Sequence, residues 1–447
     1  MTEIEENIQN KTTKIGIIGL GYVGMPLAIA FAEAGFKVLG FDAQQAKVDA
    51  VNKGKSDIVD IADESLAPLL ASESIEATGN MARLGEADAV CICVPTPLTN
   101  TKEPDLSFVK GVSQDLAQRL RPGQLIILES TTYPGTTREV ILPILQRSGL
   151  EVDKEFYLAF SPERIDPGNK KYNIKNTPKI VGGISPVSTG VAAMLYRQVA
   201  DNVVVVTSSE AAEMTKVFEN VFRSVNIALV NQMAQLCEKM GVSIWEVIES
   251  AATKPFGYMP FYPGPGIGGH CIPLDPYYLA NKAREYDFHI SFIELAAEIN
   301  ESMPYYVVAR VMEALNEGGK ALKGAKVLVL GVAYKKDSAD IRESPSLKII
   351  ELLHNKGAQV SYSDPYVKKI NNSAGNWESV SLTQKNLSSA DCVLIATDHS
   401  CFDLDRIAAW SKLIFDTRGV TRHLKDHPGI IRLGESRKQF FSAGSQP

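Results

Sequence analysis

Cysteine and histidine are both scarce in this chain. Six cysteines among 447 residues are too few for a disulfide framework, and such usage is typical of proteins from a reducing compartment. The six histidines are scattered, and the adjacent His270 and Cys271 lack the spacing of structural zinc ligands. The sequence therefore predicts no metal site.

Long apolar runs and blocks of basic residues are also absent. No run approaches the roughly 20 apolar residues that span a bilayer, and a net charge of −6 without a basic block does not suit a nucleic-acid partner. The opening residues, MTEIEENIQNKTT, are polar and acidic, which is the opposite of a signal peptide. We expect a cytoplasmic protein that binds neither nucleic acid nor a membrane.

The first part of the chain alternates short apolar strands with helices. Strands are expected at 14–19, 37–42, 89–94 and 124–129, and helices at 26–34 and 106–120. Buried strands that alternate with helices are typical of a parallel sheet. Residues 1–205 are therefore predicted to form a Rossmann domain.

The rest of the chain divides into a helical segment and a second α/β segment. Helical patterns are expected at 210–240, 244–252 and 291–315, and strands return at 325–331, 359–364, 391–397 and 413–416. We predict an α-helical central domain over 206–318 and a second Rossmann-like domain, without a full glycine fingerprint, over 319–447. The fold class is thus α/β, with two Rossmann-like domains joined by a helical domain.

A glycine motif between the first strand and the first long helix predicts a dinucleotide site. Gly19, Gly21 and Gly24 fit the pattern G-x-G-x-x-G, with Tyr22 and Val23 between the last two glycines. The glycines permit a tight turn and the close approach of a pyrophosphate to the helix N-terminus.

An acid at the end of the next strand supports this assignment. Asp42 follows Gly24 by 18 residues, close to the expected spacing. Its carboxylate can accept hydrogen bonds from the adenosine ribose and repels a 2′-phosphate, so NAD is predicted rather than NADP. Lys47 can also reach the ribose, although it equally fits a solvated helix surface.

The run from 263 to 276, PGPGIGGHCIPLDP, is too rich in glycine and proline for a regular helix or strand. Cys271 lies inside it, and Asp275 follows four residues later. Such a constrained loop suits a nucleophilic thiol with a carboxylate nearby. A tight structural turn with a buried cysteine explains the same run.

Three further stretches carry polar groups in unusual positions. Residues 129–135, ESTTYPG, end a strand with a cluster of hydroxyls, and Glu163 follows a strand-like segment directly. Lys216 and Asn220 stand at i and i+4 on one face of a predicted helix. A lysine and an amide on one face can hold a carbonyl oxygen that becomes an oxyanion.

Together these motifs resemble the UDP-glucose/GDP-mannose dehydrogenase family, and they follow the family's order along nearly the whole chain. The motif around Cys271 looks most like that of the UDP-N-acetylglucosamine 6-dehydrogenase branch. The motifs are Gly19–Gly24, Val94-Pro-Thr-Pro97, Ser130-Thr131, Ser161-Pro-Glu163, Lys216 with Asn220, Gly268-Gly-His-Cys271 with Asp275, and Tyr334–Ser344.

The resemblance implies a four-electron oxidation of a sugar CH₂OH to a carboxylate with two NAD⁺. Cys271 traps the first product, an aldehyde, as a thiohemiacetal, which is then oxidised to a thioester and hydrolysed. Lys216 and Asn220 stabilise the oxyanion, and Asp275, Glu163 and Thr131 serve as base and water ligands. The sequence leaves open which of the two acids activates the water.

The resemblance also implies the residues that contact the two nucleotides. Beyond the glycine motif, Asp42 and Lys47, the cofactor is expected to contact Pro95, Thr96, Thr131 and Arg342. The UDP-sugar is expected to contact Glu163, Arg164, Lys216, Asn220, Arg223, Phe261, Tyr262, Gly268 and Lys335. A charged domain interface is the alternative for Lys335 and Arg342.

UDP-N-acetylglucosamine is the predicted substrate, with UDP-N-acetylgalactosamine and UDP-glucose as alternatives. Relatives supply such acids to surface polysaccharides, which implies capsule or O-antigen synthesis, and they form homodimers through the helical segment. Two other hypotheses remain: a two-electron hydroxyacid-type dehydrogenase, which does not need Cys271, and a non-catalytic NAD-binding regulator.

Overall fold

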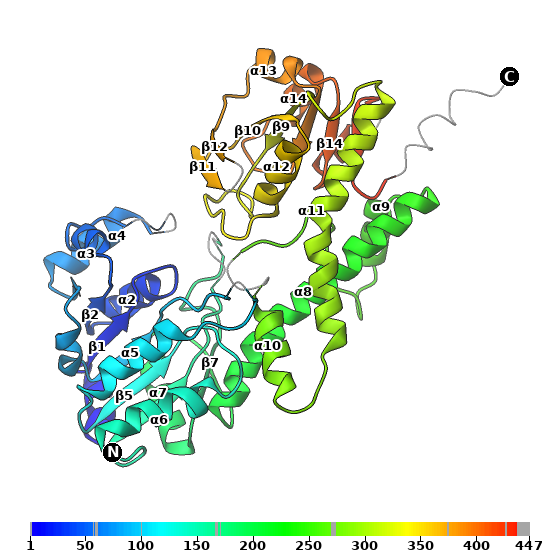
Figure 1. The fold of residues 1–447 in the computed structure, drawn as a ribbon. Helices are drawn as coiled ribbons and strands as arrows, with labels where there is room; N and C mark the ends of the chain where they lie inside the picture. The colour runs from blue at the N-terminus through cyan, green and yellow to red at the C-terminus, as the bar shows by residue number, and fades with distance from the viewer. Residues whose placement is uncertain are drawn as a thin grey trace. The chain divides into compact units, whose positions relative to one another are not determined.

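The computed structural model describes residues 2–56, 58, 61–99, 101–165, 169, 171–269, 274–372, 375–424 and 427–435. The chain forms two compact units (Figure 1). The first unit comprises Met1–Asn220 and Tyr277–His289, and the second comprises Val221–Pro276 and Ile290–Pro447.

The first unit is built on an eight-stranded sheet with the order β3-β2-β1-β4-β5-β6-β7-β8. All neighbouring strands are parallel except β6 and β7, which are antiparallel. The strands are β1 Lys14–Ile18, β2 Lys37–Phe41, β3 Ile75–Thr78, β4 Ala89–Ile92, β5 Gln124–Leu128, β6 Phe156–Phe160, β7 Lys179–Gly183 and β8 Val203–Val205.

Helices cover both faces of this sheet, because its strands are apolar on both sides. Side chains of alternate strand residues enter two separate cores, as with Ile17 in one and Ile18 in the other. The core that contains Ile17 includes residues of α1 Glu3–Asn10, α2 Gly24–Glu33, α3 Gln45–Asn52, α4 Asp63–Ala71 and α7 Pro186–Tyr196. The other includes residues of α5 Ser107–Ala117 and of the turns η1 Met81–Glu86, η2 Thr137–Ile141 and α6 Leu142–Leu145.

The second unit contains a five-stranded parallel sheet with the order β10-β9-β13-β14-β15. It also contains a two-stranded hairpin, β11 Lys369–Asn372 with β12 Gly375–Glu378. The sheet strands are β9 Lys326–Leu330, β10 Gln359–Ser363, β13 Cys392–Ile395, β14 Ile414–Asp416 and β15 Ile430–Arg432. Its helices are α9 Ile244–Ala252, α11 Ser291–Glu317, α12 Pro345–Asn355, α13 Gln384–Ser389 and α14 Leu404–Trp410.

Two helices contribute to both units, namely α8 Ser209–Met240 and α10 Asp275–Arg284. The long helix α8 agrees with the pattern expected at 210–240. The predicted fold class is confirmed, since two sheets, one mainly and one wholly parallel, flank a helical segment in the sequence. The boundaries proposed at 205 and 318 stay a prediction. No helix within the described residues is long and apolar enough to cross a membrane.

Candidate active site

The glycine loop between β1 and α2 requires glycine at two positions for different reasons. Gly19 has a φ of +95°, and a Cβ there would lie 2.6 Å from the carbonyl oxygen of Cys93. A Cβ on Gly24 would lie 1.9 Å from the carbonyl oxygen of Gly19. A Cβ on Gly21, by contrast, would meet no heavy atom within 4 Å, so this side of the loop has room for a pyrophosphate.

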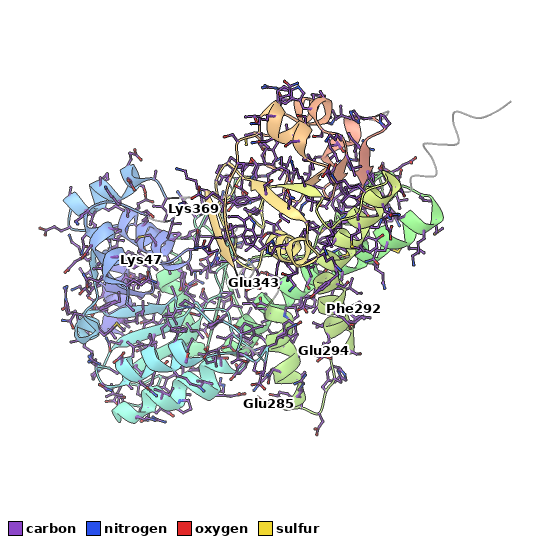
Figure 2. All side chains as sticks on the ribbon, turned by 45° about the horizontal axis from the view of Figure 1, so that its top comes forward. Lys47, Glu285, Phe292, Glu294, Glu343 and Lys369 are labelled. Atoms are coloured by element: carbon purple, nitrogen blue, oxygen red, sulfur yellow. The ribbon has the colours of Figure 1, made fainter. Side chains whose placement is uncertain are left out.

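Asp42 lies at the end of β2 and joins that strand to the glycine loop. Its Oδ2 accepts a hydrogen bond from the backbone N–H of Leu20 at 3.0 Å, and its Oδ1 accepts one from Gln44 at 2.9 Å. Lys47 of α3, which is labelled in Figure 2, makes an ion pair with Oδ2 at 3.8 Å. The carboxylate therefore stands beside the loop where the fingerprint requires it.

The turns that follow β4 and β5 are tied together. The hydroxyl of Thr96 donates to the carbonyl oxygen of Thr131 at 2.7 Å, and the hydroxyl of Ser130 donates to that of Val94 at 2.7 Å. Tyr278 of α10 donates its hydroxyl to the carbonyl oxygen of Thr96. Since both strands are parallel neighbours, these predicted cofactor and water-binding residues share one edge of the sheet.

A buried carboxylate on α8 anchors the segment after Thr131. Glu213 accepts hydrogen bonds from the backbone N–H of Gly135 at 2.6 Å, from the N–H of Thr137 at 2.8 Å and from the hydroxyl of Thr137 at 2.7 Å. Burial raises the pKa of Glu213 to about 7, and the three donors oppose that shift. The segment then enters the π-helical turn η2, a form of helix often found at functional sites.

Glu163 and Arg164, directly after β6, are held by α8. Lys216 donates to the main-chain carbonyl oxygen of Glu163 at 2.7 Å. Arg164 makes an ion pair with Glu219 at 2.6 Å and donates to the carbonyl oxygen of Pro178 at 2.7 Å. The structure thus brings together three of the predicted site residues, Glu163, Arg164 and Lys216.

The carboxylate of Glu163 belongs to a buried cluster. The ammonium of Lys179 on β7 lies 3.1 Å from Oε2 of Glu163 and 2.7 Å from Oε2 of Glu129. Tyr196 of α7 donates its hydroxyl to Oε1 of Glu129. Oε1 of Glu163 accepts the backbone N–H groups of Arg164 at 2.6 Å and of Ile165 at 2.7 Å. One buried cation therefore pairs with two buried carboxylates.

In the second unit, buried amides fix the start of the glycine- and proline-rich loop. Asn231 of α8 accepts a hydrogen bond from the backbone N–H of Gly264 at 2.9 Å and donates to Asn300 of α11 at 3.1 Å. Asn300 in turn donates to the carbonyl oxygen of Ser224 at 2.9 Å. The loop is therefore joined to both long helices by a chain of side-chain amides.

The same loop packs against the segment that follows β9. A Cβ on Gly268 would lie 2.4 Å from the Cβ of Tyr334, so only glycine fits there. Gly269, with a φ of +99°, donates its N–H to the carbonyl oxygen of Arg342 at 3.0 Å. The predicted substrate residue Gly268 and the predicted cofactor residue Arg342 are thus close neighbours, while His270 and Cys271 lie outside the described residues.

The other predicted residues occupy varied positions. The rings of Phe261 and Phe222 meet edge to face with centroids 5.8 Å apart, and those of Tyr262 and Trp245 stack with centroids 6.2 Å apart. Asp275 is buried at the first position of α10. The exposure of the rest differs: Asn220 is buried, Lys335 is partly buried, and Pro95 and Arg223 are exposed.

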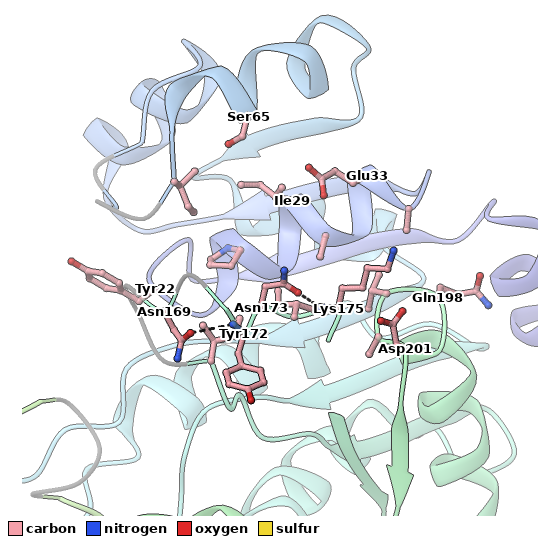
Figure 3. A pocket seen from close by; sticks show the side chains of 18 of the residues that line it. Tyr22, Ile29, Glu33, Ser65, Asn169, Tyr172, Asn173, Lys175, Gln198 and Asp201 are labelled. Atoms are coloured by element: carbon pink, nitrogen blue, oxygen red, sulfur yellow. Dashed lines mark hydrogen bonds between the residues drawn. The ribbon is translucent and has the colours of Figure 1, made fainter. Parts of the chain in front are cut away.

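A cavity of about 1020 Å³ lies along α2 in the first unit. Its lining includes Ile29 and Glu33 of α2 and Tyr22 of the glycine loop, with Tyr22 close to Asn169 (Figure 3). Asn173, also in the lining, uses its Oδ1 to accept the backbone N–H of Lys175 at 3.0 Å. Tyr22 thus connects the cofactor loop with this cavity.

Several residues that contact the site were not among the sequence predictions. Glu129 ends an apolar strand, and its acidic charge there was the available signal. Lys179 begins a strand, a position at which lysine is usually solvated, so its burial could not be read from the sequence. Arg418, after β14, was also missed; a Cβ on Gly264 would lie 2.8 Å from its guanidinium.

The two mainly parallel sheets, the glycine loop and the acid beside it define a dinucleotide-binding α/β protein. The chain belongs to the UDP-glucose/GDP-mannose dehydrogenase family. Residues 13–200 match its NAD binding domain, 210–302 its central domain and 328–423 its UDP binding domain. The predicted resemblance is therefore confirmed, and the chain is an NAD-dependent UDP-sugar dehydrogenase.

Relatives of this chain match nearly its full length. It is 37% identical to the UDP-N-acetyl-D-mannosamine dehydrogenase of Pyrococcus horikoshii over 434 residues, 95% of this chain and 99% of the relative. It is 34% identical to the UDP-N-acetyl-D-glucosamine 6-dehydrogenase of Pseudomonas aeruginosa over 359 residues, 80% of this chain and 84% of the relative. The solved structure of the Pyrococcus horikoshii UDP-D-ManNAc dehydrogenase has a TM-score of 0.86 at 34% identity, covering 94% of this chain and 99% of that chain.

Proposed function

We propose that this enzyme oxidises C6 of a UDP-linked N-acetylhexosamine from the alcohol to the carboxylate. The observation that carries the proposal is the grouping at one sheet edge of the glycine loop, Thr131, Glu163 and Lys216. We place the enzyme in the cytoplasm and its product in surface polysaccharide synthesis, as the resemblance implies.

The glycine loop and Asp42 fit NAD, since the loop leaves room beside Gly21 and the carboxylate faces the loop. When bound there, NAD⁺ accepts a hydride from the sugar carbon at each of the two oxidation steps. The proposed role of Lys216 is to stabilise the negative oxygen at C6, with Asn220 on the same helix face.

Cys271 is the proposed nucleophile. Its thiolate adds to the aldehyde carbon to give a thiohemiacetal, whose oxidation leaves a thioester. Water then attacks the thioester carbon, the thiolate leaves, and a carboxylate base takes the proton of the water. Glu163 and Asp275 are the two candidate bases; both are buried.

A count of NADH per sugar tests the four-electron reaction. We expect two NADH for each UDP-sugar consumed, because both hydrides leave the same carbon. Cys271→Ser should abolish net oxidation and leave NAD binding intact in a fluorescence titration, while Cys401→Ser, a control at an exposed cysteine, should keep full activity. One NADH per sugar, or a fully active Cys271→Ser, contradicts the proposal.

The identity of the sugar is the finer part of the proposal. UDP-N-acetylglucosamine is favoured by the motif around Cys271, and UDP-N-acetylmannosamine is a second candidate because a relative named for that substrate matches 95% of the chain. Turnover of both, with UDP-N-acetylgalactosamine and UDP-glucose beside them, should give the highest kcat/KM for one of the first two. Preference for UDP-glucose contradicts the N-acetylhexosamine assignment.

We also propose a homodimer through the helical segment. In the second unit, α8 exposes Phe222, Leu229, Met233, Leu236 and Met240 at intervals of seven, four, three and four residues. Such a stripe of large apolar side chains is typical of an interface. Light scattering after gel filtration should give a dimer for the native chain and a monomer for Leu229→Asp; an unchanged mass for the variant counts against this interface.

A further inference from the structure

We propose that Lys179 and Glu129 are positioning residues that set the orientation and the charge of Glu163. The proposal rests on the proposed function, in which Glu163 is a candidate base for hydrolysis of the thioester. Its foundation is the buried cluster in which one ammonium joins the carboxylates of Glu129 and Glu163.

The topology of the sheet explains why Lys179 faces Glu163. In the antiparallel pair formed by β6 and β7, Ala159 lies opposite Gly183 and Phe160 lies opposite Gly182. Continued past the end of β6, this register places Glu163 opposite Lys179. A parallel β7 would carry Lys179 to the other edge of the sheet.

The cluster fixes both oxygens of the Glu163 carboxylate. One oxygen accepts the N–H groups of Arg164 and Ile165, and the other accepts the ammonium of Lys179. The main-chain carbonyl of Glu163 is held at the same time by Lys216. Rotation of this carboxylate therefore requires the loss of at least one hydrogen bond to a fixed group.

The charges in the cluster have opposite effects on its two acids. Burial alone raises the pKa of Glu163, but the charge of Lys179 and the two backbone N–H groups bring it below its usual value. Burial raises the pKa of Glu129 to about 7, and the charge of Glu163 adds to that shift. Glu129 thus competes with Glu163 for the single cation.

Of the other titratable groups around the cluster, the cations Lys216 and Arg164 lie beside Glu163, and three buried groups are neutral. Burial raises the pKa values of Cys91 and Cys93 on the β4 side and of Tyr196 on α7 far above neutral pH. The ring of Tyr196 also lies 5.1 Å from the ammonium of Lys179. The charge of Glu163 is therefore set mainly by Lys179 and the two backbone N–H groups, and Glu129 holds the ammonium of Lys179 in place.

A buried ionic cluster is a poor device for stability alone, because desolvation of the charges offsets their attraction. Apolar side chains of similar size often stabilise a core as well or better. The cluster includes Glu163, whose main-chain carbonyl also accepts a hydrogen bond from Lys216. A role in positioning Glu163 therefore explains why these charges are buried.

The test uses the pH dependence of kcat, whose acid limb reports the base in the substrate-bound enzyme. Lys179→Met removes the cation and should move the acid limb up by about one pH unit or more. Glu129→Gln should leave the limb nearly unmoved, because Glu129, whose pKa is about 7, is already neutral over the range in which Glu163 titrates. Controls at exposed ion pairs, Lys14→Met and Glu76→Gln, should leave it unmoved.

If Lys179→Met does not fold, the double variant with Glu129→Gln removes a cation and an anion together. Its acid limb should then lie above that of Glu129→Gln alone. If the wild-type enzyme turns over a UDP-sugar and the acid limb is the same in the wild type and in all these variants, the positioning role is overturned. The proposed function then still stands. Wild-type protein without turnover of any UDP-sugar rejects the proposed function instead.

Calorimetry provides a readout that needs no turnover. In the Glu129→Gln background, in which no second carboxylate of the cluster titrates near pH 7, the effect of Glu163→Gln on the unfolding temperature should be the same at pH 5 and pH 8, since Glu163 is ionised at both. In the background without Lys179 and Glu129, that effect should change over this range. Equal pH dependence in the two backgrounds overturns the proposal.

Discussion

Glu213 provides a sharp test of the forces at this site, because burial and hydrogen bonding act on it in opposite directions. Its carboxyl titrates near pH 4.5 when unfolded and near 7 in the folded protein. Each pH unit between these values corresponds to about 1.4 kcal/mol, so the group changes the free energy of unfolding by about 3 kcal/mol. Because the folded pKa is the higher one, this stability is present below pH 4.5 and is lost as the pH rises through 7.

Glu213→Gln separates this titration from the loss of the contacts. The amide has one acceptor oxygen, so its NH₂ group must face either the N–H of Gly135 or the donors of Thr137. One buried donor then loses its partner, at a cost of about 1–3 kcal/mol. We expect the variant to be less stable than the wild type at pH 5 and equal to it, or more stable, at pH 8.

Differential scanning calorimetry from pH 5 to 8 measures the effect on the transition that moves when NAD is added. A change of 1 kcal/mol should shift that transition by roughly 2–4 °C in a unit of this size. Glu210→Gln is the matched control one turn earlier on α8; hydrogen bonding to Arg138 holds the pKa of Glu210 below its usual value despite burial, so its effect should be constant over this range. A wild-type advantage over Glu213→Gln that grows above pH 7 refutes the reasoning, because it means that the three donors outweigh burial.

Three further substitutions test other parts of the site. Gly24→Ala places a Cβ against the carbonyl oxygen of Gly19. It should weaken NAD binding at least about ten-fold in a titration and destabilise the folded protein by roughly 1–3 kcal/mol. The control Gly111→Ala, in open space on α5, should stabilise the folded protein by up to about 1 kcal/mol. Asp42→Asn should reduce the preference for NAD over NADP by about ten-fold, or about 1.4 kcal/mol; an unchanged ratio in paired titrations contradicts the role of the charge. Asn231→Ala leaves the N–H of Gly264 without its partner and should cost roughly 1–3 kcal/mol together with most of the kcat, while unaltered turnover would separate this loop from catalysis.

The parallel sheets could be predicted because their strands are apolar on both faces. Residues 37–42 and 124–129 are such runs, and the structure places β2 and β5 there. The glycine loop could be predicted for a related reason, since Gly19 and Gly24 have neighbours that exclude any side chain. These features could be predicted because the surroundings of each position admit only one kind of residue, an apolar one in the buried strands and glycine in the loop.

The cluster around Lys179 could not be predicted, because its members are far apart in the sequence. Glu129 precedes Lys179 by 50 residues and meets it only through the order and direction of β5, β6 and β7. A lysine at a strand start usually extends its ammonium into solvent. Lys179 is buried because β7 runs antiparallel to β6, and the short run KIVGG gives no sign of that direction.

The candidate thiol shows a third situation. Cys271 could be selected from the sequence because of the glycines and prolines around it, although it lies outside the described residues. The structure adds the supports before it, namely the amides of Asn231 and Asn300 and the close contact of Gly268 with Tyr334. Amides on helix faces are common in any protein, so nothing in the sequence distinguished these two.

The reversed strand β7 has a consequence for how related chains can vary. The pairing of Lys179 with Glu163 depends on the ladder between β6 and β7 and on the short extension of β6 as far as Ile165, and not on the length of the rest of the connection. Insertions or deletions beyond Ile165 can therefore leave the pair intact, while a slip of one residue in the ladder would turn the lysine to the opposite face. A chain redesigned in this region can accept a new loop there as long as the two strands keep their alignment.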